Sequence, residues 1–125
     1  MKTAVVYSSK LGNTKLAAEK IARAIGADIF KLGTDTVDVS QYERVILATG
    51  VYAGKISKAM DEYISNNDVK KASLVVTCMY KGEKGAKQLE DISNRYGIAD
   101  AIFFNKADIK SESDDSKLAE YIKSL

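Results

Sequence analysis

Three short stretches of this sequence carry groups that could bind a phosphate and a planar ring. Hydroxyl and amide side chains with one glycine form the first, Ser8-Ser9-Lys10-Leu11-Gly12-Asn13-Thr14, directly before a predicted helix. A tyrosine stands close to glycine in the other two, Thr49-Gly50-Val51-Tyr52-Ala53-Gly54 and Met79-Tyr80-Lys81-Gly82. Backbone N–H groups at a helix N-terminus favour an anion such as phosphate. Two tyrosine faces can hold a planar ring between them.

Each stretch has a plainer interpretation when it is taken alone. Ser8–Thr14 can be the N-cap of an ordinary helix, and Tyr52 or Tyr80 can be a partly exposed tyrosine that covers a strand end. Neither Gly-x-x-x-x-Gly-Lys-Ser/Thr nor Gly-x-Gly-x-x-Gly occurs, so the first stretch is neither a P-loop nor a dinucleotide fingerprint. The three stretches together favour a binding site over three unrelated surface loops.

The composition excludes several kinds of catalytic site. The sequence has no histidine, which removes Ser-His-Asp triads, imidazole metal sites and histidine acid-base catalysis. It has no tryptophan, so any aromatic stacking falls to other residues. The single cysteine, Cys78, has no partner for an internal disulfide, and we interpret it as a small buried residue rather than a redox thiol. We expect no metal site and no catalytic side chain.

The elements that would position the three stretches alternate between strand and helix. Buried strands are predicted at Thr3–Tyr7, Asp28–Leu32, Val45–Ala48, Leu74–Cys78 and Ala101–Phe104. Apolar repeats predict helices around residues 17–25, 56–64 (from Ile56) and 86–96 (from Ala86). A last helix over 118–125 follows a capping signal at Ser111-Glu112-Ser113-Asp114. Gly33–Glu43 has no such repeat, so the second helix is short or absent.

This alternation predicts a three-layer α/β fold with a mostly parallel sheet, because right-handed crossovers return each strand in the same direction. In such sheets the ligand binds beyond the carboxyl ends of the strands. The three stretches follow the first, third and fourth predicted strands, so the fold would bring them to that one edge.

We expect one domain spanning residues 1–125, since no repeat or linker-like segment divides the chain. The longest uncharged stretches, Val45–Gly54 and Ala72–Tyr80, are far shorter than the roughly 20 apolar residues of a membrane-spanning helix. No secretory signal follows Met1, so the expected compartment is the cytosol. The net charge of +2 gives no reason to expect nucleic acid as a partner.

Ser9-Lys10-Leu11-Gly12-Asn13-Thr14 resembles the flavodoxin phosphate loop, Ser/Thr-x-Thr-Gly-x-Thr. Tyr52 stands where many flavodoxins have the aromatic residue that stacks on the isoalloxazine ring. The likeness covers nearly the whole chain, and the fifth strand lacks an insertion, as in short-chain members. It implies a five-stranded parallel sheet in the order 2-1-3-4-5. Tyr42-Glu43-Arg44-Val45-Ile46 and Tyr52-Ala53-Gly54 look closest to the branch that includes menaquinone-dependent protoporphyrinogen oxidase.

The resemblance implies FMN as the cofactor, with its phosphate surrounded by Ser8, Ser9, Lys10, Gly12, Asn13 and Thr14. Tyr52 would cover one face of the ring and Tyr80 the other. Ala53-Gly54 would lie near the flavin N5 atom, where a peptide carbonyl turns, and glycine makes such a turn cheap. Leu11 departs from the family's threonine, which removes one hydroxyl from the phosphate site. The remaining cofactor contacts would come from Thr49, Gly50, Val51, Met79, Lys81 and Gly82.

Lysines gather in or just after the loops at the expected cofactor edge, where Glu83 is the one acid: Lys10, Lys15, Lys55, Lys58, Lys81, Lys84 and Lys87. They can be an ordinary solvated surface. If they form a basic rim, each nearby charge adds about 1 kcal/mol of attraction, which stabilises an anionic reduced flavin and favours acidic partners.

The resemblance therefore implies an electron-transfer flavoprotein that shuttles electrons between redox partner proteins, acidic ones among them, because the cofactor supplies the chemistry. Two alternatives stay open: an FMN-dependent oxidoreductase with a small, anionic substrate, and a flavodoxin-like module without cofactor that binds partners. A receiver-type signalling module would need acids where the first and third strands end, and this chain has Ser8-Ser9-Lys10 and Ala48-Thr49-Gly50 there. We expect a monomer with no nucleic-acid or membrane partner.

Overall fold

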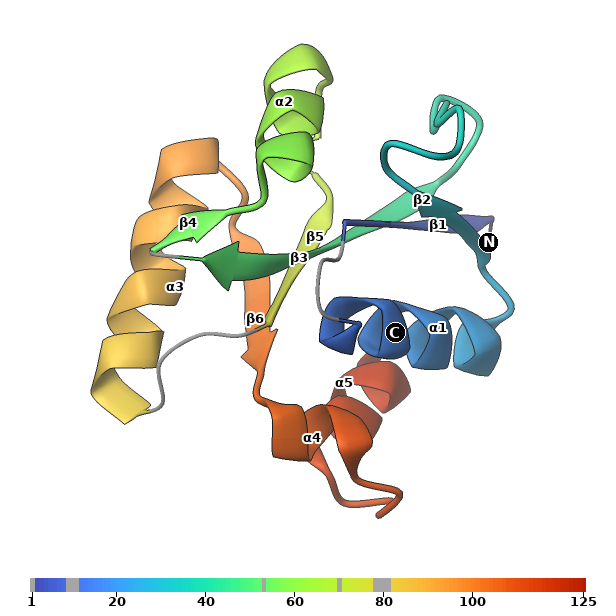
Figure 1. The fold of residues 1–125 in the computed structure, drawn as a ribbon. Coiled ribbons are helices and arrows are strands. Elements are labelled where there is room, and N and C mark those ends of the chain that lie inside the picture. Colours follow the sequence, from blue (N-terminus) through green and yellow to red (C-terminus); the bar gives the residue numbers. More distant parts are fainter. Residues whose placement is uncertain (1, 9–11, 53, 70, 78–81) are drawn as a thin grey trace.

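A parallel sheet forms the centre of the computed structural model, which describes residues 2–8, 12–52, 54–69, 71–77 and 82–125 (Figure 1). Its strands run in the order β2-β1-β3-β5-β6. They are β2 (Asp28–Lys31), β1 (Thr3–Ser8), β3 (Arg44–Tyr52), β5 (Ser73–Thr77) and β6 (Asp100–Phe104). This is the predicted order 2-1-3-4-5, with β5 and β6 as the fourth and fifth parallel strands.

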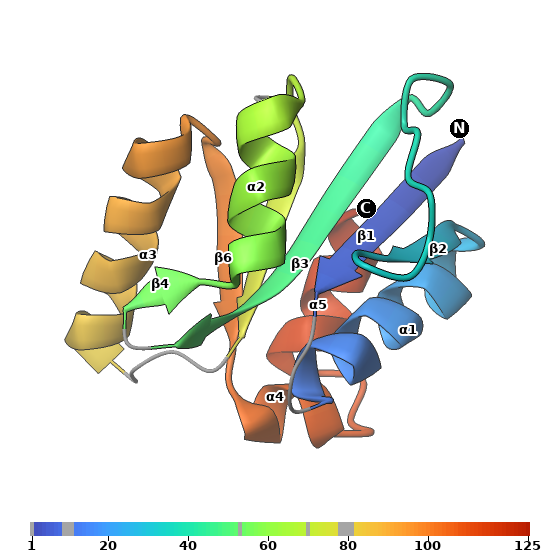
Figure 2. The same ribbon diagram turned by 45° about the horizontal axis from the view of Figure 1, so that its top comes forward.

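Helices cover both faces of the sheet, as Figures 1 and 2 show. One face carries α1 (Asn13–Ile25), α4 (Lys106–Lys110) and α5 (Lys117–Ser124). The other carries α2 (Lys58–Asn66) and α3 (Gly82–Tyr96). The alternation of strand side chains separates two cores: Val5 faces α1 and α5, while Val6 faces α2 and α3. The three-layer prediction is confirmed.

Residues 33–43 contain no helix, as the missing apolar repeat predicts. Two valines of this segment, Val37 and Val39, still pack against the core on the α2 side and cover part of it. No helix of the described ranges is long and apolar enough to cross a membrane.

The prediction that all strands are buried is wrong for β2. Three of its four residues are exposed, and Ile29 keeps 38% of its surface. Two causes combine. β2 is one of the two edge strands of the sheet and pairs with β1, and the loop over residues 33–43 covers less of its face than a helix would.

Ile56 was predicted as the start of the second apolar repeat, and it belongs instead to β4 (Lys55–Ile56). β4 runs antiparallel to β3, with Tyr52 opposite Lys55, so the chain reverses direction between these two residues. Gly54 has a φ of +80°, which an L side chain rarely adopts, and this explains why the reversal occurs there. The helix begins two residues after Ile56, behind Ser57, whose hydroxyl accepts the Met60 N–H.

The capping signal predicted at Ser111-Glu112-Ser113-Asp114 is also wrong. The N-cap of α5 is Ser116, whose hydroxyl accepts the Ala119 N–H at 3.1 Å. A short helix that the apolar repeat did not reveal, α4, precedes this loop. α4 begins with a capping box, in which the side chains of Asn105 and Asp108 each accept the other's backbone N–H.

The third helix ends at Tyr96 as predicted, and Gly97 follows with a φ of +67°. Ile92 of the predicted apolar repeat is buried, but Ala86 is exposed and its neighbour Gly85 is buried instead.

Candidate functional site

The N-terminus of α1 lies just beyond the carboxyl end of β1, which is where the sequence predicts a phosphate site. Its N-cap is Gly12, with φ +89° and ψ −15°, which as a glycine brings no capping side chain of its own. The first turn contains no acid that would repel an anion. A Cβ on Gly12 would meet no atom of the described residues within 4 Å, which leaves space on that side of the helix start. The helix end therefore offers backbone N–H groups and a positive dipole end to an anion.

Thr14, in the first turn of α1, turns its side chain into the protein. Its hydroxyl lies 2.7 Å from the hydroxyl of Thr77, the last residue of β5, and both residues are buried. This hydrogen bond joins the helix start to the sheet edge across 63 residues of sequence. In this structure Thr14 holds the position of the helix N-terminus.

A second hydroxyl network lies on the opposite face of the same edge. Ser57 Oγ donates to Ser8 Oγ at 2.9 Å and accepts the Met60 N–H at 3.2 Å. Thr49 Oγ1 accepts the Ser57 N–H at 3.3 Å and donates to the Gly50 carbonyl at 3.0 Å. The network fixes the end of β1, the end of β3 and the start of α2 relative to one another.

Buried polar side chains gather at this edge. Four of the five in the described ranges lie there, namely Thr14, Thr49, Ser57 and Thr77. Each has a hydrogen-bond partner, so the edge is rigid without leaving a polar group unsatisfied. Ser57 and Thr77 were not predicted as site residues. Ser57 carried a signal, since a serine directly before an apolar helical repeat is a typical N-cap.

Tyr52 ends β3 at the same edge and is partly exposed. Its ring folds back along its own strand over Gly50. A Cβ atom on Gly50 would lie 2.8 Å from Tyr52 Oη and 3.0 Å from Cζ. Gly50 thus provides the flat backbone surface on which the ring rests, and the ring stands at the strand end where an aromatic cover is predicted.

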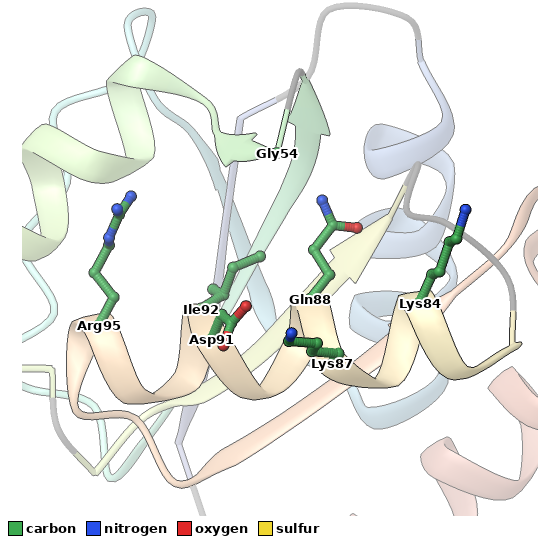
Figure 3. A pocket seen from close by; sticks show the side chains of 7 residues that line it. All are labelled: Gly54, Lys84, Lys87, Gln88, Asp91, Ile92 and Arg95. Atoms are coloured by element: carbon green, nitrogen blue, oxygen red, sulfur yellow. The ribbon is translucent and has the colours of Figure 1, made fainter.

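A pocket opens beside Gly54, between the β3–β4 turn and α3. It has a volume of about 530 Å³, and Figure 3 shows side chains of α3 lining it: Lys84, Lys87, Gln88, Asp91, Ile92 and Arg95. Two lysines of the predicted basic rim, Lys84 and Lys87, therefore do lie next to Gly54. Asp91 and Arg95 were missed because they stand further along the helix, outside the loop segments.

Other lysines of the predicted rim are placed differently. Lys55 and Lys58 line a neighbouring pocket of about 320 Å³ that shares Arg95 with the first, and Lys58 Nζ lies 4.0 Å from Glu62. Lys15 is exposed on α1. At the far end of this neighbouring pocket, Tyr96 donates to Asp61 at 2.6 Å. Burial, followed by this hydrogen bond, raises the pKa of Tyr96 to about 12.

The structure thus brings the described members of all three stretches to one sheet edge: Ser8, Gly12, Asn13, Thr14, Thr49, Gly50, Val51, Tyr52, Gly54 and Gly82. Thr49 and Val51 are buried, so their side chains support this edge and are not exposed on it. Ser9, Lys10, Leu11, Ala53, Met79, Tyr80 and Lys81 lie outside the described residues, as does Cys78. Within the described part of the chain, no group of acidic, histidine or cysteine side chains could hold a metal ion.

The chain as a whole is similar to several solved structures. Flavodoxin 2 from Bacillus cereus has the same fold, with a TM-score of 0.69 at 18% identity, covering 99% of this chain and 97% of that one. A flavodoxin from the domain Archaea gives 0.63 at 18% identity, covering 98% and 99%. A flavoprotein from Lactobacillus acidophilus, solved in complex with FMN, gives 0.62 at 17% identity, covering 83% and 91%.

These likenesses show the fold. A search of the curated proteins finds no significant match. The family follows from the sequence itself, because residues 4–108 match the family model described as "Flavodoxin domain". The matched range contains β1 with the start of α1, the end of β3 and the pocket-lining part of α3, and on this ground the chain belongs to the flavodoxin domain family.

Proposed function

We propose that this protein binds FMN without a covalent bond and carries electrons between redox partner proteins, as a cytosolic monomer. The observation that carries the proposal is the start of α1. A glycine N-cap in the left-handed conformation, followed by a first turn without an acid, stands beyond the first strand of a flavodoxin domain. The Lactobacillus flavoprotein, solved with FMN, supports the choice of cofactor.

The residues present fit such a group. The backbone N–H groups at Gly12 and Asn13 would hold the phosphate, together with the predicted Ser9 and Lys10. Tyr52 would cover one ring face, and Gly54 would stand near the reacting edge of the ring. Bound FMN would supply the one- and two-electron chemistry. The hydroxyl networks of Thr14 and Ser57 keep these groups in place.

The chain's own residues would bind and position the cofactor, which explains how a site without histidine can serve a redox reaction. Acidic partners are favoured by Lys84, Lys87 and Arg95 around the pocket beside Gly54, where Asp91 is the one acid lining it. Attraction of this kind raises association rates and weakens with salt.

Stopped-flow electron exchange tests the partner class. The FMN-loaded protein is mixed in its oxidised form with a reduced, acidic ferredoxin, and in its reduced form with an oxidised, basic cytochrome c. The proposal expects the rate with ferredoxin to fall as salt rises and the rate with cytochrome c to rise, since salt screens attraction and repulsion alike. The opposite salt dependence would contradict an electropositive docking surface.

A second function has one observation in its favour. The 530 Å³ pocket beside Gly54 is large enough for a small organic molecule, as an FMN-dependent oxidoreductase with its own substrate would need. Turnover of that molecule by the FMN-loaded protein, with no partner protein present, separates this function from electron carriage.

A further inference from the structure

We infer that the pocket between Gly54 and α3 is a binding site for an apolar organic carboxylate. Its volume of about 530 Å³ lies within the roughly 300–1,000 Å³ typical of small-molecule sites. It is bounded by a helix on one side and by the β3–β4 turn on the other, two elements far apart in the sequence (Figure 3).

The charges around the pocket select an anion. Lys84, Lys87 and Arg95 line it, against the single carboxylate of Asp91. All four residues are exposed, so their charged groups can meet a ligand at the pocket mouth. Arg95 adds a planar fork of donors that matches a carboxylate in two parallel hydrogen bonds.

The wall of the pocket suits an apolar body. Ile92, which is buried and keeps 5% of its surface, is the apolar side chain among the described residues that line it. The aliphatic stems of Lys84 and Arg95 rise on either side of Ile92 along the helix (Figure 3). Beside Gly54 no atom of the described, non-neighbouring residues lies within 4 Å of where a Cβ would stand, which leaves room for a ligand at that end.

The inference that this pocket binds a carboxylate rests on the lining residues just described and does not require FMN. Its use rests on the proposed function, because a ligand beside Gly54 is next to a reacting ring only if FMN occupies the strand-end site. A bound carboxylate would then be held within reach of the cofactor edge.

The test titrates 2-naphthoate, and the uncharged 2-naphthalenemethanol of the same shape, into the protein with and without FMN. Calorimetry gives the dissociation constants. We expect naphthoate to bind and to remain bound when FMN is present. We expect the alcohol to bind roughly tenfold more weakly, since it lacks the charge.

Two matched triple variants locate the site. K84Q/K87Q/R95Q removes the three cations of the pocket, and K71Q/K106Q/K110Q makes the same change in net charge at exposed lysines that line neither pocket. We expect the first to weaken naphthoate at least tenfold and the second to leave it within about twofold. D91N, which removes the one acid, should tighten binding about threefold.

Equal binding of acid and alcohol, or equal weakening in both triple variants, would overturn the inference. Displacement of naphthoate by FMN would also overturn it, because the pocket would then be part of the flavin site. If the protein takes up no FMN, the proposed function fails, while the titration of the flavin-free protein still decides whether the carboxylate site exists.

Discussion

Gly12 is the residue on which the phosphate site most depends. Its φ of +89° costs an L side chain about 1–2 kcal/mol, although a Cβ there would touch nothing. We expect G12A to lower the free energy of unfolding by that amount. A variant that relaxes when empty must restore the strained conformation to bind, so FMN affinity should fall about tenfold.

Gly26 provides the control for Gly12. It also has a positive φ, +68°, and open space around it, but it caps the opposite end of α1. G26A should lower stability to a similar extent and leave FMN affinity unchanged, as urea denaturation and FMN titration would show. Equal loss of affinity in the two variants would mean that helix stability, rather than the N-terminal conformation, controls binding.

The hydrogen bond between Thr14 and Thr77 leads to a prediction about stability. T14V keeps the shape of the side chain but removes one partner of a buried 2.7 Å hydrogen bond, so we expect a loss of about 1–3 kcal/mol in the flavin-free protein. T14V/T77V should lose less than the sum of the single variants, measured by urea denaturation. Strict additivity would show that the two hydroxyls do not act as a pair.

At the scale of single residues, the sequence predicted where the chemistry lies better than how each group is used. The run from Ser8 to Thr14 was recognised from its residue types. The pairing of Thr14 with Thr77 depends on two segments 63 residues apart that meet only through the strand order. The fold of Tyr52 over Gly50 depends on the end of β3, where the chain reverses into β4.

At the scale of elements, Tyr96 joins α3 to Asp61 of α2 and makes stability depend on pH. Its pKa in the folded protein is about 12, against an ordinary value of 10.0. The unfolded chain therefore releases this proton first, and the stabilisation that is complete below pH 10 is lost as the pH rises to 12.

Y96F removes that dependence together with the hydrogen bond. We expect it to be less stable than the parent protein by about 1 kcal/mol at pH 8, with the difference shrinking between pH 10 and 12. Urea denaturation of both proteins across this pH range measures the difference in their free energies of unfolding. Y42F is the matched control, since Tyr42 donates to Asp28 at 2.7 Å on an exposed surface and should change stability little. Parallel curves for Y96F and the parent would contradict the role of Tyr96.

The elements that the sequence missed share a physical cause. α4 and β4 are too short for an apolar period to show, and they are specified by local geometry instead: the Asn105–Asp108 capping box and the reversal at Gly54. The strong periods of α1 and α3 were sufficient. The exposure of β2 was missed because it depends on the neighbours of the strand rather than on its own residues.

At the scale of the molecule, the sheet order follows from strand–helix alternation and the family likeness, and it delivers three distant loops to one edge. The pocket beside Gly54 was beyond reach of the sequence, because it lies between a turn and the middle of a helix more than 30 residues later. Two lysines of the predicted basic rim, Lys84 and Lys87, line this pocket. Arg95 and the acid Asp91, which the sequence did not indicate, line it as well.

The visible spectrum of the purified protein tests the central claim most directly. The account predicts a yellow protein, or a colourless one that stays yellow after FMN has been added and the unbound FMN removed by gel filtration, with FMN released on denaturation in a ratio of about one to one. G12A should hold less of it and G26A as much as the parent. A protein that stays colourless with excess FMN while folded would contradict the proposed function.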